Sequence, residues 1–219
     1  MRALLRVFLV VAACFAATFL FIKFTGALTI EQIEGWLALA KELSPLYVGA
    51  LVALLLFADL FIAVPTLTIT ILSGYFLGHT YGSIAALTGV LLAGSCGYTL
   101  SRYYGETILN YLIKEEEKRN EAIEAFQQHG FAMILLSRAM PILPEVTACL
   151  SGMTRMAFGK FIMAWLISSV PYVFIASYAG SVSSIEDPKP AIFAAIGISL
   201  FLWILWLVYL HKTLSLIHI

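Results

Sequence analysis

The chain has 219 residues, of which 61% are hydrophobic and 12% charged, and its mean hydropathy is +0.94. This composition excludes an ordinary soluble domain and predicts an all-α, polytopic membrane protein. The formal net charge is zero, so nothing in the composition indicates a nucleic-acid partner. Cys14, Cys96 and Cys149 lie in apolar runs without metal-ligand or redox spacing, so we expect packing residues, no metal and no other cofactor.

Residues 1–44 predict one membrane span followed by a helix on the membrane surface. The segment 4–24 is apolar, with Arg2, Arg6 and Lys23 at its ends. A cleaved signal peptide is the alternative, but the uncharged core is long for one and bulky residues crowd its end. The segment 29–43 has an acidic first turn and one apolar face, which is typical of an interfacial helix.

Residues 45–80 predict a re-entrant hairpin. Its first arm is apolar except for Asp59 and ends at Pro65, which cannot supply the N–H of a continuing helix. The second arm, 66–77, carries threonines at alternate positions and is expected to be extended or loosely helical. We interpret Asp59 as a protonatable group facing a cavity; the alternative is a residue near the interface. The first arm is also long enough to cross the membrane fully, which is the alternative to a hairpin.

A span and a polar helix connect this hairpin to the next one. Small residues recur every four positions in the span 82–104 and predict a ridge for close helix packing rather than a ligand site. The segment 105–129 is rich in glutamate but keeps an apolar edge, which predicts an amphipathic helix on the membrane surface. Gly130 suits the position that follows a helix end.

Residues 131–157 predict a second re-entrant hairpin, and this stretch is our main site candidate. Arg138 ends its first arm, Pro141 and Pro144 break the helix, and Glu145 opens the second arm. An arginine and a carboxylate in so apolar a setting cost several kcal/mol unless they are paired or solvated. Irregular backbone at membrane depth occurs only where protein buries it or where it lines a watery cavity.

The two hairpins share a sequence pattern. Residues 64–74 (VPTLTITILSG) and 143–152 (LPEVTACLSG) both begin with an apolar–Pro pair and end in Leu-Ser-Gly. Such paired, interrupted apolar segments in matching halves indicate the substrate site of a transporter. The site candidates from the repeat are Pro65, Gly74, Pro144 and Gly152.

Two further spans, 158–180 and 191–211, are separated by a polar turn at 181–190. The chain is therefore expected to have three parts: residues 1–44, a core of residues 45–180, and residues 181–219. With the basic N-terminus in the cytoplasm, both termini are cytoplasmic and the hairpins enter from opposite faces, as in an inverted repeat.

Three stretches carry a resemblance to a known family. The segment "FIAVPTLTITILSGYFLGHTYGS" precedes a small-residue span that ends in "SRYYG", and "HGFAMILLSRAMPILPEVTACLSGMTRMAFGKF" follows. Over about residues 45–180 they resemble the DedA or VTT-domain membrane family, formerly called SNARE-associated Golgi proteins. Its most specific part is the order Gly130, Phe131, Arg138, Pro141, Gly152, Met153, Phe158 and Phe161.

The resemblance implies two facing re-entrant helices and transbilayer movement of lipids. Bacterial members are linked to recycling of undecaprenyl phosphate and to envelope homeostasis that depends on the proton-motive force, and eukaryotic members resemble phospholipid scramblases. Bacterial members also carry acidic residues near the first hairpin, which Asp59 fits, and two arginines in the second motif, of which Arg138 matches the first. This sequence departs from the family at the second arginine, where Pro144 stands beside Glu145.

We therefore expect an integral multi-pass protein of a bacterial inner membrane that acts as a flippase or scramblase. Its partners are expected to be membrane lipids, either anionic phospholipid or polyprenyl phosphate, with protons as a coupling ion and with a homo-oligomer as a further expectation. Arg138 is assigned to the phosphate, and Asp59 and Glu145 are assigned as the titratable pair. The alternatives are a structural Arg138–Glu145 ion pair, a proton-coupled carrier of a small solute or ion, and an assembly protein.

An intramembrane serine hydrolase is a weaker alternative. Ser73 and Ser151 each precede a glycine, but the glycine two residues before the serine is missing at both places. His79, near an interface, is the only histidine close to span depth, whereas nucleophilic catalysis needs a base within hydrogen-bond reach. We therefore expect no catalytic residues.

Overall fold

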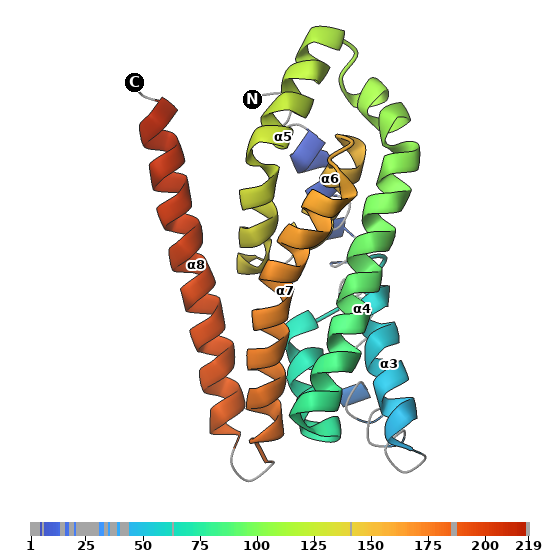
Figure 1. The fold of residues 1–219 in the computed structure, drawn as a ribbon, viewed down its shortest axis with the longest axis vertical. Helices are drawn as coiled ribbons and strands as arrows, with labels where there is room; N and C mark the ends of the chain where they lie inside the picture. The colour runs from blue at the N-terminus through green and yellow to red at the C-terminus, as the bar shows by residue number, and fades with distance from the viewer. Residues whose placement is uncertain are drawn as a thin grey trace.

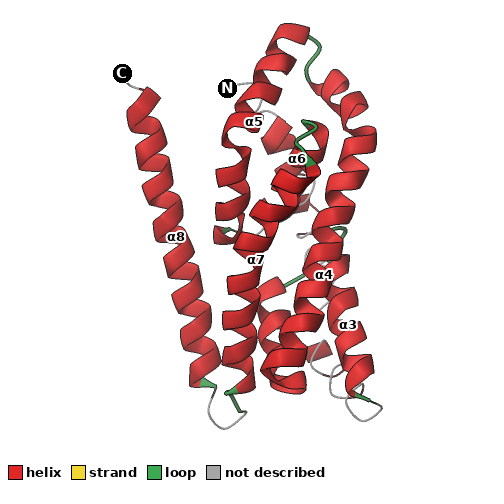
Figure 2. Ribbon diagram, in the orientation of Figure 1, coloured by secondary structure: helices red, strands yellow, loops and turns green. Residues whose placement is uncertain are grey.

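The computed structural model describes residues 44–62, 64–140, 142–184 and 188–217, together with fragments of the first 43 residues (5, 7–13, 16–17, 20, 31–32, 35 and 39). The predicted first span and surface helix lie mostly outside the described residues. Every described element from residue 44 onward is a helix, which confirms the all-α class (Figure 2). Three described helical stretches are long and apolar enough to cross a membrane, as a polytopic protein requires: Thr66–Gly105, Phe158–Ser181 and Lys189–Val208.

The first hairpin consists of α3 (Pro45–Ala58) and the beginning of α4 (Thr66–Leu112). α3 begins at Pro45 because the Ser44 hydroxyl accepts a hydrogen bond from the Leu46 N–H at 3.3 Å and proline suits a first helical turn. At 14 residues, α3 is shorter than the roughly 20 residues that a membrane span needs. Figure 1 shows it ending about halfway along the molecule, where the chain turns back into α4.

α4 changes direction at Gly78, so residues 66–77 complete the hairpin and the remainder runs along the bundle (Figure 1). Gly78 has φ 76° and ψ 168°, a combination that only glycine adopts readily. The arm 66–77 is regular α-helix, in which the Thr70 hydroxyl donates to the Thr66 carbonyl at 2.8 Å. Of the two predicted forms, extended or loosely helical, the structure shows the helical one.

The second hairpin starts from the opposite end of the bundle (Figure 1). α5 (Glu116–Leu136) runs inward to the short helix η1 (Ser137–Ala139), and α6 (Leu143–Met153) runs back out. The predicted helix over 105–129 needs correction, because α4 extends to Leu112 and α5 continues past Gly130. A Cβ on Gly130 would lie 2.6 Å from the Phe126 ring and 2.8 Å from the Met156 methyl group, so this glycine permits close packing instead of ending the helix.

α7 (Phe158–Ser181) and α8 (Lys189–Ile217) complete the described fold. Each hairpin's returning arm crosses the long helix of the other half at a glycine. A Cβ on Gly74 would lie 1.8 Å from the Ser177 carbonyl oxygen in α7, and one on Gly152 would lie 2.2 Å from the Tyr98 carbonyl oxygen in α4. The first hairpin therefore packs on α7 and the second on α4, which holds the two tips toward each other.

The small-residue ridge in 82–104 packs against α3 at Gly89. A Cβ on Gly89 would lie 2.6 Å from the Ala53 carbonyl oxygen, so the two backbones approach as closely as glycine allows. The prediction that this ridge serves helix packing is confirmed at this position.

Candidate functional site

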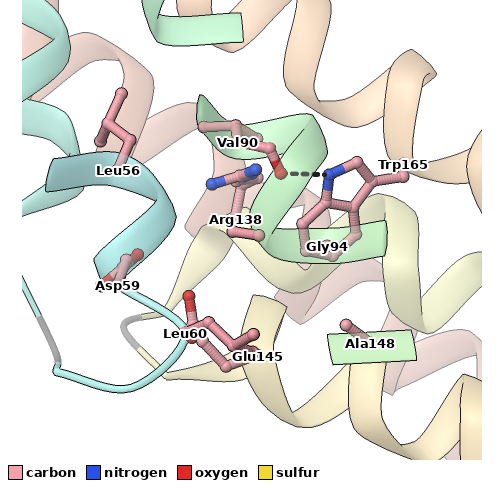
Figure 3. A pocket seen from close by; sticks show the side chains of 10 residues that line it. Leu56, Asp59, Leu60, Val90, Gly94, Arg138, Glu145, Ala148 and Trp165 are labelled. Atoms are coloured by element: carbon pink, nitrogen blue, oxygen red, sulfur yellow. Dashed lines mark hydrogen bonds between the residues drawn. The ribbon is translucent and has the colours of Figure 1, made fainter. Parts of the chain in front are cut away.

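The three charged residues singled out in the sequence meet where the hairpin tips face each other. Asp59 follows α3, Arg138 lies in η1, and Glu145 lies in the first turn of α6. All three line a cavity of about 10 Å³ together with residues of α4 and α7, and Figure 3 shows their side chains converging there. This volume is close to the minimum for a single water molecule.

Asp59 organises the tip of the first hairpin. Its carboxylate accepts a hydrogen bond from the Val64 N–H at 2.9 Å and another from the Thr66 hydroxyl at 2.7 Å. These bonds close the turn between α3 and α4. They also place a carboxylate acceptor at the start of α4, because the N-cap residue Pro65 has no side chain that could accept a hydrogen bond there. The side chain is 7% exposed, so the carboxyl group lies inside the protein and not at a surface.

Arg138 is held mainly by neutral groups on α7. Its guanidinium donates to the Ser169 hydroxyl at 2.9 Å and lies 5.2 Å from the Trp165 ring centroid and 5.3 Å from that of Tyr172. Both distances are typical of cation–π contacts. Within the described part of the chain, Arg138 has no ion pair at or below 4.0 Å, and its buried Nε has no hydrogen-bond partner.

Glu145 lies beside Asp59 at the start of α6. Both carboxyl groups line the same cavity, and two carboxyl groups this close disfavour a state in which both are charged. The residue before α6, Ile142, has φ 74°, a left-handed conformation that costs a non-glycine residue about 1–3 kcal/mol. Backbone strain of this kind is concentrated at functional sites.

Trp165 connects this site to α4. Its indole N–H donates to the Val90 carbonyl at 3.2 Å, as the dashed line in Figure 3 shows. The indole fits there because residue 94 is glycine, whose added Cβ would lie 2.4 Å from the ring. The aromatic face next to Arg138 is therefore fixed by a hydrogen bond and by close packing.

A larger chamber of about 400 Å³ opens from the same three charged residues toward α8. It combines polar groups at the hairpin tips with apolar side chains of α8, so its lining suits an amphiphilic ligand. The lining residues are Asp59, Val64, Pro65, Thr66, Leu67, Thr68, Arg138, Ala139, Met140, Ile142, Pro144, Glu145, Tyr172, Ile198, Ser199, Leu202 and Trp203.

The remaining predicted site residues separate into two groups. Pro65 and Pro144 line the chamber. Gly74 and Gly152 do not line it and lie at the helix crossings described above, where a Cβ would overlap a backbone carbonyl oxygen. Pro141 lies outside the described residues.

Sequence reasoning missed the α7 residues that hold Arg138. Trp165, Ser169 and Tyr172 follow one another at intervals of four and three, which places them on one face of a helix. This spacing was visible in the sequence. The spacing did not indicate that this face of α7 would contact the tip of the second hairpin, which lies about thirty residues earlier in the chain.

The fold and the site define a polytopic helical membrane protein in which two hairpin tips bring charged side chains together inside the bundle. Comparison with known families then places it: residues 64–182 match the model of the VTT domain, and the chain belongs to that family. The resemblance inferred from the sequence motifs is confirmed.

The curated relatives are bacterial proteins of low identity. An uncharacterized membrane protein of Synechocystis sp. is 31% identical over 142 residues, covering 58% of this chain and 64% of that protein. Undecaprenyl phosphate transporter A of Bacillus subtilis is 23% identical over 126 residues, covering 53% and 64%. Protein DedA of Escherichia coli (strain K12) is 24% identical over 100 residues, covering 44% and 46%. The chain thus spans less than two thirds of the length of each of these relatives. No solved structure matches it.

Proposed function

We propose that this protein moves a phosphate-bearing lipid headgroup across the bilayer, through the polar region where the two hairpin tips meet. In this proposal both hairpins are re-entrant, and the chamber between their tips and α8 receives the headgroup. Irregular backbone and charged side chains are tolerated at membrane depth where they line such a cavity.

The state of Arg138 carries the proposal. Its contacts on α7 are a hydroxyl group and two aromatic rings, which orient the guanidinium. Its buried Nε has no partner, and the side chain lines the 400 Å³ chamber. A guanidinium presents paired N–H donors that match phosphate oxygens, so Arg138 suits a lipid phosphate that enters the chamber.

The two carboxyl groups supply a place for a proton beside the phosphate site. Asp59 and Glu145 lie next to each other and both line the chamber with Arg138. A second negative charge arriving on a phosphate favours protonation of this pair, and loss of the proton favours release of the phosphate. We therefore include proton coupling in the proposed mechanism.

The relatives support a membrane transporter and suggest a substrate class. One bears the name undecaprenyl phosphate transporter, so a polyprenyl phosphate is one candidate and an anionic phospholipid is the other. Both present a phosphate on a hydrocarbon chain, which is the chemistry that the chamber suits.

The test is translocation of labelled lipid in reconstituted vesicles of phosphatidylcholine and phosphatidylglycerol. Labelled phosphatidylglycerol and undecaprenyl phosphate form separate arms, each measured with and without a pH gradient.

Arg138→Lys keeps the positive charge but loses the planar set of N–H donors. We expect its translocation to be at least about tenfold slower than that of the wild type, equivalent to about 1.4 kcal/mol. Glu145→Gln preserves the shape but removes the ionisable group, and we expect it to lose the response to the gradient.

Arg119→Lys is the matched control, because Arg119 lies near the start of α5 and does not line the chamber. It should translocate lipid at the wild-type rate. Folded Arg138→Lys protein with undiminished translocation would remove Arg138 from the site, and wild-type protein that moves neither lipid would overturn the proposed function.

A further inference from the structure

A second cavity, of about 300 Å³, lies between α7 and α8. Apart from Ser168 and the Tyr172 hydroxyl, its walls are apolar, and they come entirely from these two helices. The lining residues are Ser168, Pro171, Tyr172 and Ile175 of α7, and Ala194, Gly197, Ile198, Phe201 and Leu202 of α8. We call this cavity the α7–α8 groove.

The groove continues into the chamber that holds Arg138. Tyr172, Ile198 and Leu202 line both spaces. A ligand that follows this path passes from an apolar wall to a tip region that holds one arginine and two carboxyl groups. The order of the two surfaces along the path therefore matches a lipid, with its hydrocarbon chain in the groove and its phosphate at Arg138.

α8 is loosely attached along this path. Its described side chains between residues 189 and 208 are half-buried or exposed, in contrast to the buried faces of α4 and α7. Figure 1 shows α8 diverging from the other helices as it leaves the α7–α8 turn. Gly197 has no atom within 4 Å of where a Cβ would be, so the groove is open at its middle.

We propose that the α7–α8 groove binds the hydrocarbon chain of the transported lipid, and that the lipid reaches Arg138 sideways from the bilayer between these two helices. This inference rests on the proposed function. It commits the groove to one occupant, the acyl or prenyl chain of a lipid whose phosphate matches the N–H donors of Arg138. It also assigns α8, which lies beyond residue 182 where the VTT match ends, to lipid recognition.

Filling the groove tests the inference. Gly197→Trp places an indole in the open space, whereas Leu200→Trp places the same group on α8 at a residue that is 59% exposed and does not line the groove. In vesicles of phosphatidylcholine and phosphatidylglycerol, Gly197→Trp should slow translocation of labelled phosphatidylglycerol by about tenfold or more, equivalent to about 1.4 kcal/mol of lost binding. Leu200→Trp should retain the wild-type rate.

Photolabelling provides a readout that does not depend on transport. Phosphatidylglycerol with a photoactivatable diazirine on its acyl chain should label wild-type protein on peptides from both sides of the groove, around Ile175 and Phe201. Labelling there should be lost in Gly197→Trp and kept in Leu200→Trp, as measured by mass spectrometry of the cross-linked protein.

The outcomes separate the two proposals. If the wild type translocates lipid and Gly197→Trp is as fast and as strongly labelled as Leu200→Trp, the tail site is overturned while the proposed function stands. If the wild type translocates no lipid, the proposed function is overturned. Labelling in the groove would then show only that a membrane lipid binds there, and not that the lipid is transported. Selective loss of both translocation and labelling in Gly197→Trp establishes the tail site.

Discussion

At the scale of single residues, the site is defined by how Arg138 is held. Removing one partner of a buried ion pair costs about 3–5 kcal/mol, because the other charge is left without a partner. Here the direct contacts are instead a hydroxyl group and two rings, and the neighbouring carboxyl groups lie beyond ion-pair distance. Arg138 and Glu145 therefore form no direct ion pair within 4.0 Å.

Ser169→Ala tests this arrangement. The substitution removes the hydroxyl that holds the guanidinium, and a hydrogen bond to a charged group contributes about 1.5–3 kcal/mol. We expect lipid translocation to fall by about tenfold, mainly through a higher lipid fraction at half-maximal rate. Ser181→Ala, which removes a hydroxyl bonded only within the end of α7, serves as the control. Equal kinetics in the two variants would show that Ser169 does not position Arg138.

At the scale of elements, glycines set the distances between hairpins and long helices. The returning arm of each hairpin lies so close to its partner helix that a single Cβ would overlap a backbone carbonyl oxygen. Association of helices inside a membrane depends on such close packing, because burial of apolar surface contributes little there. Gly74 and Gly152 lie about two helical turns from the hairpin tips, and the close packing at these glycines fixes the positions of the tips.

Gly74→Ala and Gly159→Ala form a matched pair that tests the crossings. An added methyl at residue 74 meets the Ser177 carbonyl oxygen, and overpacking of this kind costs about 1–3 kcal/mol or more. At residue 159, in the first turn of α7, the methyl meets nothing within 4 Å, and alanine improves helix propensity by up to about 1 kcal/mol. Thermal unfolding in detergent, followed by size-exclusion chromatography, should give a lower midpoint for Gly74→Ala only. Equal midpoints would contradict the crossing geometry.

At the scale of the whole molecule, charge distribution predicts orientation. The end of the bundle that holds the α4–α5 and α6–α7 turns carries Lys114, Lys118, Arg119, Arg155 and Lys160. In the described residues around the α7–α8 turn at the other end, the basic residue is Lys189. Because cytoplasmic segments are enriched in lysine and arginine, we infer that the first end faces the cytoplasm, together with the C-terminal end of α8.

Cysteine accessibility tests this orientation. The native cysteines are first replaced by alanine, and Lys114→Cys or Ser184→Cys is then introduced as a single cysteine. These two cysteines should react with reagents added on opposite sides of the membrane. A membrane-impermeant maleimide should label Ser184→Cys in intact bacteria and Lys114→Cys only after lysis. The reverse pattern would invert the orientation, and labelling of both in intact cells would show that α7 does not separate the two turns by a membrane.

The sequence by itself determined the features that depend on local composition. Long apolar runs specify membrane helices, prolines specify the breaks at the hairpin tips, and rare charges in apolar surroundings single out Asp59, Arg138 and Glu145. Each of these signals is contained in a window of about twenty residues, so no three-dimensional information was needed to detect it. The family motif lies in the same windows and was recognisable for the same reason.

Only the tertiary structure decided which groups meet. Asp59 and Glu145 are far apart in the chain, and they become neighbours because the hairpins start from opposite ends and are held by the Gly74 and Gly152 crossings. The hydroxyl and the two rings that contact Arg138 come from a face of α7 about thirty residues away. Gly130 has the local signature of a helix end, yet contact with Met156 gives it a packing role. Long-range packing overrides local preference in these cases, because the free energy of a site depends on all the groups around it.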